Sequence, residues 1–219
     1  MKLIIANWKN HPATRDDAIA LARAEDIEGL VIAPPEKFMS DVARVLEHAT
    51  LGAQDYNENI KSLGVQYVIV GHSERRARGE TDAMVAEKMK LVLEQGMTPI
   101  LCVGESAAEH ATGRAKEVVQ EQLRLDLNSI LHSRYSIPPI IAYEPIWAIS
   151  TNPNALPDTP ENASNMIQFI KEVISVPAFH VLYGGSMDEH NARSFLAESA
   201  IDGYLVGGAS LRPEAIRKI

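Results

Sequence analysis

Residues 67–103 read YVIVGHSERRARGETDAMVAEKMKLVLEQGMTPILCV and contain a strand–helix–strand unit. The apolar runs 67–70 and 99–103 do not alternate with polar residues, which is typical of parallel strands covered by helices. Residues 82–95 between them have helical spacing. Thr81 supplies an N-cap for this helix, and Gly96 supplies the left-handed residue at which it ends. The stretch therefore predicts a βαβ unit with parallel strands.

The same alternation continues in both directions along the chain. We expect strands at residues 3–6, 30–33, 51–53, 67–70, 99–103, 140–143, 180–183 and 204–206. We expect helices at residues 16–23, 36–47, 82–95, 114–131, 190–196 and 213–219, with another that opens at 159–162. Eight such units predict an α/β fold closed as a (β/α)8 barrel, although the pattern alone leaves an open doubly wound sheet as the alternative. No linker or low-complexity tract divides the chain, so residues 1–219 are expected to form one domain.

One connection in this series is unusually short. Only residues 55–62 separate the third expected strand from the approach to the fourth, which leaves room for a loop and one helical turn. The whole chain, at 219 residues, is also shorter than the ~250 typical of such barrels. We therefore expect a shortened third βα loop.

Charge and cysteine content exclude several classes of protein. The formal net charge is −8, which disfavours a nucleic-acid-binding or membrane-binding surface, because both need basic residues. No apolar stretch approaches the ~20 residues that span a bilayer. The single cysteine, Cys102, cannot form an internal disulfide. We expect a cytoplasmic protein with a small-molecule partner.

Polar residues follow most of the apolar runs, at the strand ends where barrels of this kind carry their active sites. Asn7 and Lys9 follow the first run, and His72 follows the fourth. Glu144 follows the sixth run, and Gly-Gly turns follow the seventh and eighth at 184–185 and 207–208. A cation, an imidazole, a carboxylate and two glycine turns are thus predicted to converge on one rim.

The two glycine turns point to an anionic ligand. Glycine lets the backbone approach closely and direct several N–H groups at one anion. A single Gly-Gly is usually no more than a turn, but barrels often bind phosphate at the loops after strands seven and eight. Two such turns in these consecutive loops favour a phosphate site.

Each candidate side chain can also be interpreted as a residue with no catalytic role. Lys9 alone would be a solvated surface lysine, but beside phosphate it becomes a point charge for the ligand. His72 opens an expected helix, whose dipole disfavours imidazolium and favours a neutral ring; the alternative is a buried or capping histidine. Glu144 is expected to be partly buried away from water, which would raise its pKa towards the range useful for a general base. It could equally form an ion pair with Lys9 or an arginine.

The remaining candidates have structural interpretations. We interpret Cys102 as a core residue, and Glu74 and Glu105 as partners of Lys9 and Arg75. The other histidines show no metal-ligand spacing, and no Walker or dinucleotide glycine motif is present. These absences speak against a metal, ATP or a nicotinamide cofactor, so we expect no cofactor.

At these residues the sequence resembles the triosephosphate isomerase family. The matching stretches are 7–9 (NWK), 71–76 (GHSERR), 102–105 (CVGE), 142–149 (AYEPIWAI), 183–186 (YGGS) and 205–210 (LVGGAS), in the family's order along nearly the whole chain. The resemblance implies a single-domain TIM barrel. It also implies interconversion of dihydroxyacetone phosphate and D-glyceraldehyde 3-phosphate in glycolysis and gluconeogenesis, without a cofactor.

The residue roles below come from the resemblance and not from spacing or composition. Glu144 would take a proton from the substrate carbon, and neutral His72 would polarise the carbonyl. Asn7 and Lys9 would bind and stabilise the substrate. Backbone amides near Ser150, Ser186, Gly207 and Gly208 would hold the phosphate, and Ser73, Glu74 and Cys102 would support the site. A mobile lid would consist of Pro145, Ile146, Trp147, Ala148, Ile149, Ser150 and Thr151.

The chain also departs from the family pattern. Ser150 and Asn152 stand at the lid tip where the family has glycines, and residues 156–158 are extra. The family's third loop reaches into a neighbouring subunit, and here that loop is short. The usual dimer contact is therefore expected to be absent or rebuilt, which predicts a monomer or a dimer through another surface. The rival reading is a phosphosugar-binding barrel with weak or no turnover, but phosphate binding alone requires neither Glu144 nor His72.

Overall fold

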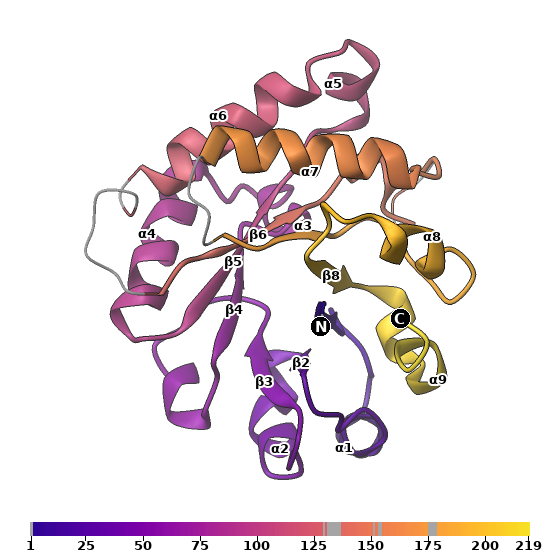
Figure 1. Ribbon diagram of the computed structural model, residues 1–219. Coiled ribbons are helices and arrows are strands. Elements are labelled where there is room, and N and C mark those ends of the chain that lie inside the picture. The colour runs from indigo at the N-terminus through magenta and orange to yellow at the C-terminus, as the bar shows by residue number, and fades with distance from the viewer. Residues whose placement is uncertain (1, 129, 131–136, 151, 153–154, 175–178) are drawn as a thin grey trace.

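The computed structural model describes residues 2–128, 130, 137–150, 152, 155–174 and 179–219. Eight parallel strands pair in sequence order, and β1 pairs with β8 to close the barrel (Figure 1). The strands are β1 (Leu3–Asn7), β2 (Leu30–Ala33), β3 (Thr50–Ala53), β4 (Tyr67–Val70), β5 (Thr98–Val103), β6 (Ile140–Tyr143), β7 (Val181–Tyr183) and β8 (Gly203–Val206). The predicted closed barrel is confirmed, and the open sheet is excluded.

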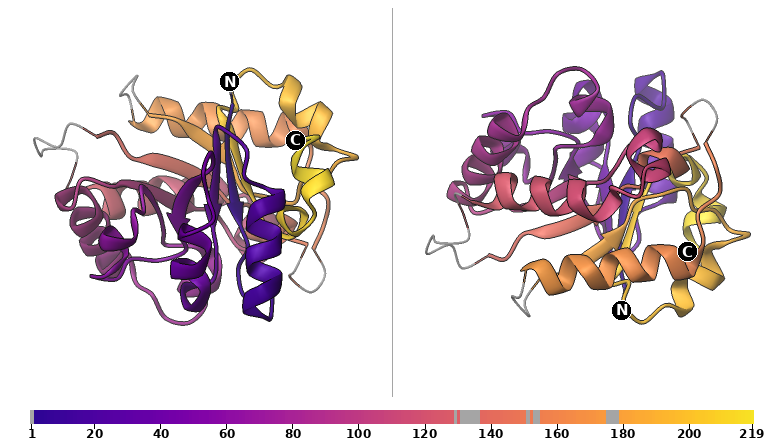
Figure 2. Two further views of the ribbon diagram at one scale, coloured as in Figure 1. Left: turned by 90° about the horizontal axis from the view of Figure 1, so that it is seen from below. Right: turned by 90° about the horizontal axis from the view of Figure 1, so that it is seen from above.

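Helices surround the strands, and α6 lies beside α7 along one side of the barrel (Figures 1 and 2). The α-helices are α1 (Arg15–Ala24), α2 (Met39–Ala43), α3 (Ser73–Arg76), α4 (Asp82–Glu94), α5 (Ala107–Ala111), α6 (Ala115–Leu127), α7 (Pro160–Ile174), α8 (Ala192–Ala197) and α9 (Pro213–Ile216). Short 3-10 helices are η1 (Glu36–Phe38), η2 (Ile60–Leu63), η3 (Ile146–Ala148) and η4 (Gly208–Leu211). Within the described part of the chain, no helix is long and apolar enough to cross a membrane.

The strands lack alternation because both of their faces are buried. In β4, Ile69 belongs to the cluster that fills the barrel interior. Its neighbours Val68 and Val70 belong to the larger cluster between the strands and the helices. Consecutive strand residues point to opposite faces, so a strand with apolar packing on both sides reads as a continuous apolar run.

The helix within the opening stretch forms as predicted. The Thr81 hydroxyl accepts a hydrogen bond from the Met84 N–H at the start of α4. Val85 and Met89 on one face of α4 are fully buried. Gly96 follows the helix with a φ of 71°, the left-handed geometry expected at a helix end.

The helix predicted over residues 36–47 is wrong in length. The chain forms η1 and then α2, which ends at Ala43. The carboxylate of Asp26 accepts hydrogen bonds from the backbone N–H groups of Glu47, His48 and Ala49, at 2.9, 2.9 and 2.7 Å. These N–H groups are turned towards a side chain outside the helix, so the helix cannot continue through them.

The third connection is as short as predicted, and it packs on its own barrel. Residues 54–66 contain only the 3-10 turn η2. Asp55 lies 2.5 Å from the Arg75 guanidinium and 2.7 Å from the Lys88 ammonium group. The Tyr56 hydroxyl accepts a hydrogen bond from the Gln95 side chain at 2.7 Å. These contacts hold the loop against α3, α4 and the residue after α4.

Candidate active site

A small cavity of about 50 Å³ lies at the carboxyl ends of the strands, where the polar residues were predicted to converge. Its lining includes all the catalytic candidates and both glycine turns. The lining residues are Asn7, Lys9, His72, Glu144, Ile149, Ser150, Gly184, Gly185, Ser186, Met187, Leu205, Gly207, Gly208 and Ala209. The structure therefore brings together residues that lie as far apart in the sequence as Asn7 and Ala209.

Glu144 directly follows β6 and is 3% exposed. Its Oε1 atom lies 3.0 Å from His72 Nε2, and its Oε2 atom accepts a 3.0 Å hydrogen bond from the Ser73 N–H. Burial raises the pKa of Glu144, but the interactions with His72 and Ser73 outweigh burial and lower it. The expected raised pKa is thus wrong for this arrangement, because the carboxylate is solvated by protein donors instead of water. Its partner is His72, and not Lys9 or an arginine.

Two glycines let the backbone and side chain of Glu144 occupy this position. A Cβ atom on Gly104 would lie 1.9 Å from the Glu144 carbonyl oxygen. A Cβ atom on Gly184 would lie 2.9 Å from Glu144 Cγ. The Gly104 clash is with the backbone and could not be relieved without moving the segment that carries the carboxylate, whereas the Gly184 clash is with the Glu144 side chain itself.

His72 caps the N-terminus of α3, as its position before an expected helix indicated. Its Nδ1 atom accepts a 3.3 Å hydrogen bond from the Glu74 N–H, which leaves Nε2 to carry the proton. Nε2 faces Glu144. Burial lowers the pKa of His72, and the Glu144 carboxylate raises it by more, so the pKa is raised in this arrangement. The neutral ring expected during reaction stays a prediction, and it applies once Glu144 has moved away.

Lys9 has a φ of 52°, so its backbone is left-handed although it is not glycine. Its ammonium group lies 2.8 Å from Glu74 Oε1, which confirms the predicted pairing with Glu74. Its N–H donates to Asn7 Oδ1 at 3.0 Å. Asn7 thus helps to hold an unfavourable backbone conformation that directs the Lys9 side chain into the site.

Gln54 is a site residue that the sequence analysis missed. Its Nε2 atom donates to the carbonyl oxygens of Lys9 and Ala33, at 2.7 and 2.9 Å. Gln54 therefore supports Lys9 through its backbone carbonyl, while Asn7 supports it through its backbone N–H. It directly follows β3, so the search for polar residues after strands could have found it had the third run been included.

Trp8 anchors the same segment beneath the site. It is fully buried, and its indole N–H donates to Glu25 Oε2 at 3.0 Å. The other carboxylate oxygen of Glu25 is buried without a hydrogen-bond partner. Burial raises the pKa of Glu25 from 4.5 to about 7, although Trp8 and Arg217 lower it.

The raised pKa of Glu25 predicts a pH-dependent stability. Between about pH 4.5 and pH 7 the unfolded chain releases this proton while the folded protein keeps it, so the free energy of unfolding falls as pH rises. Glu25→Gln removes the titration and keeps an acceptor for Trp8. We expect it to be about 3 kcal/mol more stable than wild type at pH 8 and nearly equal at pH 5.

Urea denaturation of both proteins at the two pH values measures this difference. Glu28→Gln is the matched control, because Glu28 is an exposed carboxylate three residues away, and its curve should follow wild type. A Glu25→Gln protein less stable than wild type at pH 8 would contradict the assignment.

The lid rests on the glycine loop after β7. The Ser150 N–H donates to Ser186 Oγ at 2.6 Å, and the Ser186 N–H donates to the Ala148 carbonyl at 3.3 Å. Both amides that were expected to hold phosphate therefore bond within the protein, whereas Gly207 and Gly208 line the cavity at the start of η4. Within the predicted lid, 145–150 are described, and Thr151 lies outside the described residues.

Glu105 does not pair with Arg75, so this expectation is wrong. Glu105 is fully buried and accepts hydrogen bonds from the Tyr143 hydroxyl at 3.1 Å and from the Trp147 indole at 2.7 Å. It lies beneath the start of the lid, while Arg75 pairs with Asp55. Cys102 packs inside the barrel, and burial raises the pKa of its thiol, in line with its interpretation as a core residue.

A larger groove of about 870 Å³ lies beside the cavity and shares Asn7, Lys9 and His72 with it. Its lining includes residues 54–57 of the shortened third connection. Among the described residues, no group of three histidine, cysteine or acidic side chains could hold a metal ion.

Comparisons with known proteins give matches along nearly the whole chain. The family model described as triosephosphate isomerase matches residues 2–219. A triosephosphate isomerase of Delftia acidovorans is 36% identical over 235 residues, which cover 96% of this chain and 94% of the relative. One of Salmonella paratyphi B is 35% identical over 245 residues, which cover 99% of this chain and 94% of the relative.

Proposed function

Since this chain belongs to the triosephosphate isomerase family, we propose the residue roles by which its site carries out the reaction. The chain is an isomerase that interconverts dihydroxyacetone phosphate and D-glyceraldehyde 3-phosphate, a step of glycolysis. Glu144 is the base, His72 the electrophile, and Lys9 and Asn7 the polar groups around the reacting oxygens. One observation carries the proposal: Glu144, His72 and Lys9 line a single small cavity together with both glycine turns.

Glu144 begins the reaction from a retracted position. Its carboxylate contacts His72 and Ser73, so it must rotate into the cavity to reach the substrate carbon next to the carbonyl. There it removes a proton, and the electron pair of the broken C–H bond forms the C=C bond of an enediolate. Loss of its two protein donors on rotation raises its pKa, because the buried charge is then less stabilised. The carboxylate becomes a stronger base where it acts.

His72 completes the proton transfer. With Nδ1 accepting from the Glu74 N–H, the Nε2 proton is the one available to the substrate oxygen. The Nε2–H group hydrogen-bonds the carbonyl as negative charge develops on it, and proton exchange moves the charge to the neighbouring oxygen. Glu144 then returns its proton to the other carbon. The departure of the Glu144 charge from Nε2 favours the neutral ring that this step needs.

The phosphate is held by backbone N–H groups and one cation. Gly207 and Gly208 line the same cavity as Glu144 and His72, and a Cβ atom on Gly207 would lie 3.5 Å from Lys9 Cε. Glycine at these two positions lets the ligand approach the backbone. The Ser150 and Ser186 amides join them once the lid rearranges over the bound substrate. Since the cavity measures about 50 Å³, entry of a triose phosphate requires the lid to open.

A coupled assay of D-glyceraldehyde 3-phosphate conversion tests the proposal on wild type and Glu144→Ala side by side. Turnover in wild type that collapses in the variant supports the assigned base. Equal background in both proteins would mean that the barrel binds phosphosugars without isomerising them.

We also propose that the chain does not form the dimer built through a long third loop. The contacts of the third connection support this proposal. Asp55 pairs with Arg75 and Tyr56 binds Gln95, so these side chains contact the barrel of their own chain. We further propose a cytoplasmic location, for which the buried free thiol of Cys102 is the supporting observation.

Light scattering of the purified chain tests the assembly. We expect a mass near 24.0 kDa, the mass of one chain, or a dimer that Tyr56→Ala leaves intact. The reason is that the third connection does not extend away from the barrel. A dimer that dissociates when Tyr56 is replaced would show that this loop still forms the contact, and would contradict the proposal.

A further inference from the structure

Asp126 is a buried acid that the reaction described above does not use. It lies on the buried face of α6, where the other buried residues are the apolar Val119, Leu123 and Leu127. Its Oδ2 atom lies 2.6 Å from the Arg76 guanidinium. Its Oδ1 atom is buried and has no hydrogen-bond partner among the described residues. Since a buried charge is costly unless it is paired, Asp126 depends on Arg76.

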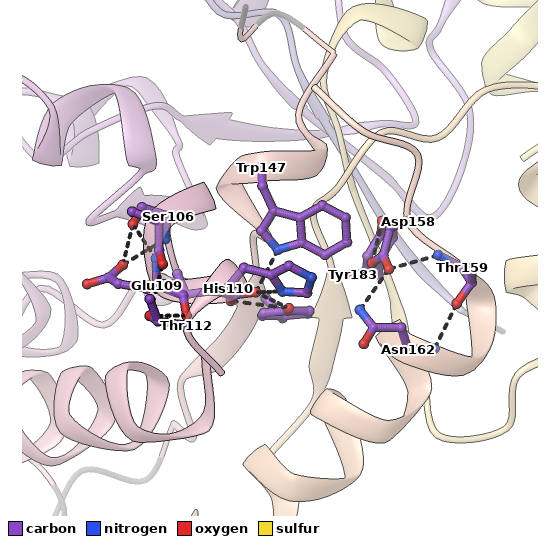
Figure 3. Close-up of polar contacts among 12 residues, drawn as sticks. Ser106, Glu109, His110, Thr112, Trp147, Asp158, Thr159, Asn162 and Tyr183 are labelled. Atoms are coloured by element: carbon purple, nitrogen blue, oxygen red, sulfur yellow. Dashed lines mark hydrogen bonds and ion pairs between the residues drawn. The ribbon is translucent and has the colours of Figure 1, made fainter. Parts of the chain in front are cut away.

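Glu105 is the contrasting case near the site. It is also fully buried, but the Tyr143 hydroxyl donates to it at 3.1 Å and the Trp147 indole at 2.7 Å (Figure 3). The negative charge of Glu105 is therefore stabilised by neutral donors. The negative charge of Asp126 is instead paired with a guanidinium, so each of these two groups limits where the other can lie.

The Arg76 guanidinium connects two strand ends with two helices. Its Nε atom donates to the Gly71 carbonyl at 2.8 Å, just after β4, and its Nη2 atom donates to the Cys102 carbonyl at 3.3 Å, in β5. Nη1 lies 2.5 Å from Asp82 at the start of α4, and Nη2 binds Asp126 in α6. A guanidinium is planar and holds its donors in a fixed fork, so these four partners are kept in one arrangement.

Two contacts of Arg76 hold the backbone of His72. The Gly71 carbonyl belongs to the peptide group that joins Gly71 to His72, so the Arg76 side chain fixes the plane of that peptide. The Arg76 N–H donates to the His72 carbonyl at 3.1 Å. Gly71 has a φ of 71°, and a Cβ atom there would lie 3.0 Å from Arg76 Nη2. Arg76 therefore holds the chain on both sides of the imidazole.

The charges of the cluster are consistent with this arrangement. Burial lowers the pKa of Arg76, but Asp126 and Asp82 raise it by more, so the guanidinium stays charged. Burial raises the pKa of Asp126 to about 7; Arg76 lowers it, and the nearby Asp82 raises it. Arg76 is thus the group that stabilises the Asp126 carboxylate.

We propose that Asp126 and Arg76 are positioning residues for His72: Asp126 orients the guanidinium, and the guanidinium fixes the backbone from which the imidazole reaches the substrate oxygen. Both act through His72, which lines the cavity, and not by contact with the substrate. They therefore affect the proton transfer more than the binding of phosphate. The inference rests on the proposed function, since His72 needs this support only if it polarises the substrate carbonyl.

Two conservative variants test the cluster. Arg76→Lys keeps the positive charge but loses the planar fork that reaches four partners at once. Asp126→Asn keeps the shape and an acceptor oxygen but removes the charge that orients the guanidinium. Arg124→Lys and Glu121→Gln are the matched controls, because these two residues form an ion pair at 2.7 Å on the exposed face of the same helix.

We expect kcat to fall about a hundredfold in Arg76→Lys, the order of loss for a misplacement of ~1 Å. In Asp126→Asn we expect a fall of about tenfold, because a charge-assisted bond becomes a neutral one while the other contacts of Arg76 remain. KM should stay within about twofold in both. The double variant should resemble Arg76→Lys alone, since both substitutions act through the same guanidinium. Steady-state kinetics measures these changes, and both controls should match wild type.

The imidazole signal of His72 reports its position without any turnover. In nitrogen-15 NMR spectra of histidine-labelled protein, this signal is assigned by its absence from His72→Gln. The Nε2 resonance should shift or broaden in Arg76→Lys and in Asp126→Asn. It should stay unchanged in Arg124→Lys and Glu121→Gln. Urea denaturation of each variant shows that the folded state is populated under the conditions of the assay.

Several outcomes would overturn the positioning role while leaving the isomerase intact. These are an unchanged kcat in folded Arg76→Lys, a lower kcat with an unchanged His72 signal, and a rise in KM as large as the fall in kcat. Should Arg76→Lys fail to fold, the same criteria apply to Asp126→Asn, which keeps all the donors of Arg76. A wild type whose His72 signal responds as expected but which does not isomerise would overturn the proposed function alone.

Discussion

Replacing Glu144 with alanine should lower kcat by about ten-thousandfold, the upper range for loss of a general base. Among the described residues that line the cavity, Glu144 is the only carboxylate, whereas His72 presents Nε2–H and Lys9 presents an ammonium group. KM should change little, since the proposed phosphate contacts from Gly207, Gly208 and Lys9 remain in the variant. Steady-state kinetics in both reaction directions measures the loss.

Glu144→Asp is the matched control that separates the negative charge of the side chain from its length. It keeps a carboxylate but withdraws it by one methylene, and a misplacement of ~1 Å costs on the order of a hundredfold in rate. Turnover should therefore fall from wild type to Glu144→Asp and again to Glu144→Ala. An alanine variant that kept more than a few per cent of wild-type turnover would show that another group is the base.

Lys9→Met should lower kcat/KM by about a thousandfold, because it removes a preorganised positive charge from the place where negative charge develops. Methionine keeps the apolar stem of the side chain, and Trp8 and Gln54 still hold the segment. The free energy of unfolding should therefore move far less than activity. Kinetics together with urea denaturation distinguishes the two effects.

Lys37→Met is the control for a general effect of charge. Lys37 lines the groove next to the cavity but not the cavity itself. Removal of the Lys37 charge should leave kcat/KM within about twofold of wild type, because salt screens exposed charges that lie outside the cavity. Equal losses in the two lysine variants would mean that the net potential of the rim matters, and not the position of Lys9.

The sequence predicted the strands closely because burial on both faces leaves an unmistakable pattern. The expected runs 67–70 and 140–143 coincide with β4 and β6. The helix expected over 36–47 does not reach residue 47, where Asp26, a residue outside the helix, binds the backbone N–H groups of Glu47 and His48. A local pattern carries no information about such a partner.

The same distinction applies to the site. The search at strand ends found Lys9, His72 and Glu144, since a closed barrel brings all strand ends to one rim. It could not give the left-handed backbone of Lys9 or the direction of the Glu144 pKa shift. Both depend on which hydrogen-bond donors and acceptors surround the residue. Glu105 was misassigned for the same reason, because its partners come from β6 and the lid.

The groove beside the cavity gives this enzyme a basis for selective inhibition. A compound with a phosphate on the Gly207–Gly208 side could pass Lys9 and His72 and extend into the groove of about 870 Å³. Its outer part would contact residues 54–57 of the short third connection and Arg75, all of which line the groove. Relatives with a long third loop would present a different surface there. Selectivity would then come from the extension, while affinity for the shared chemistry came from the phosphate end.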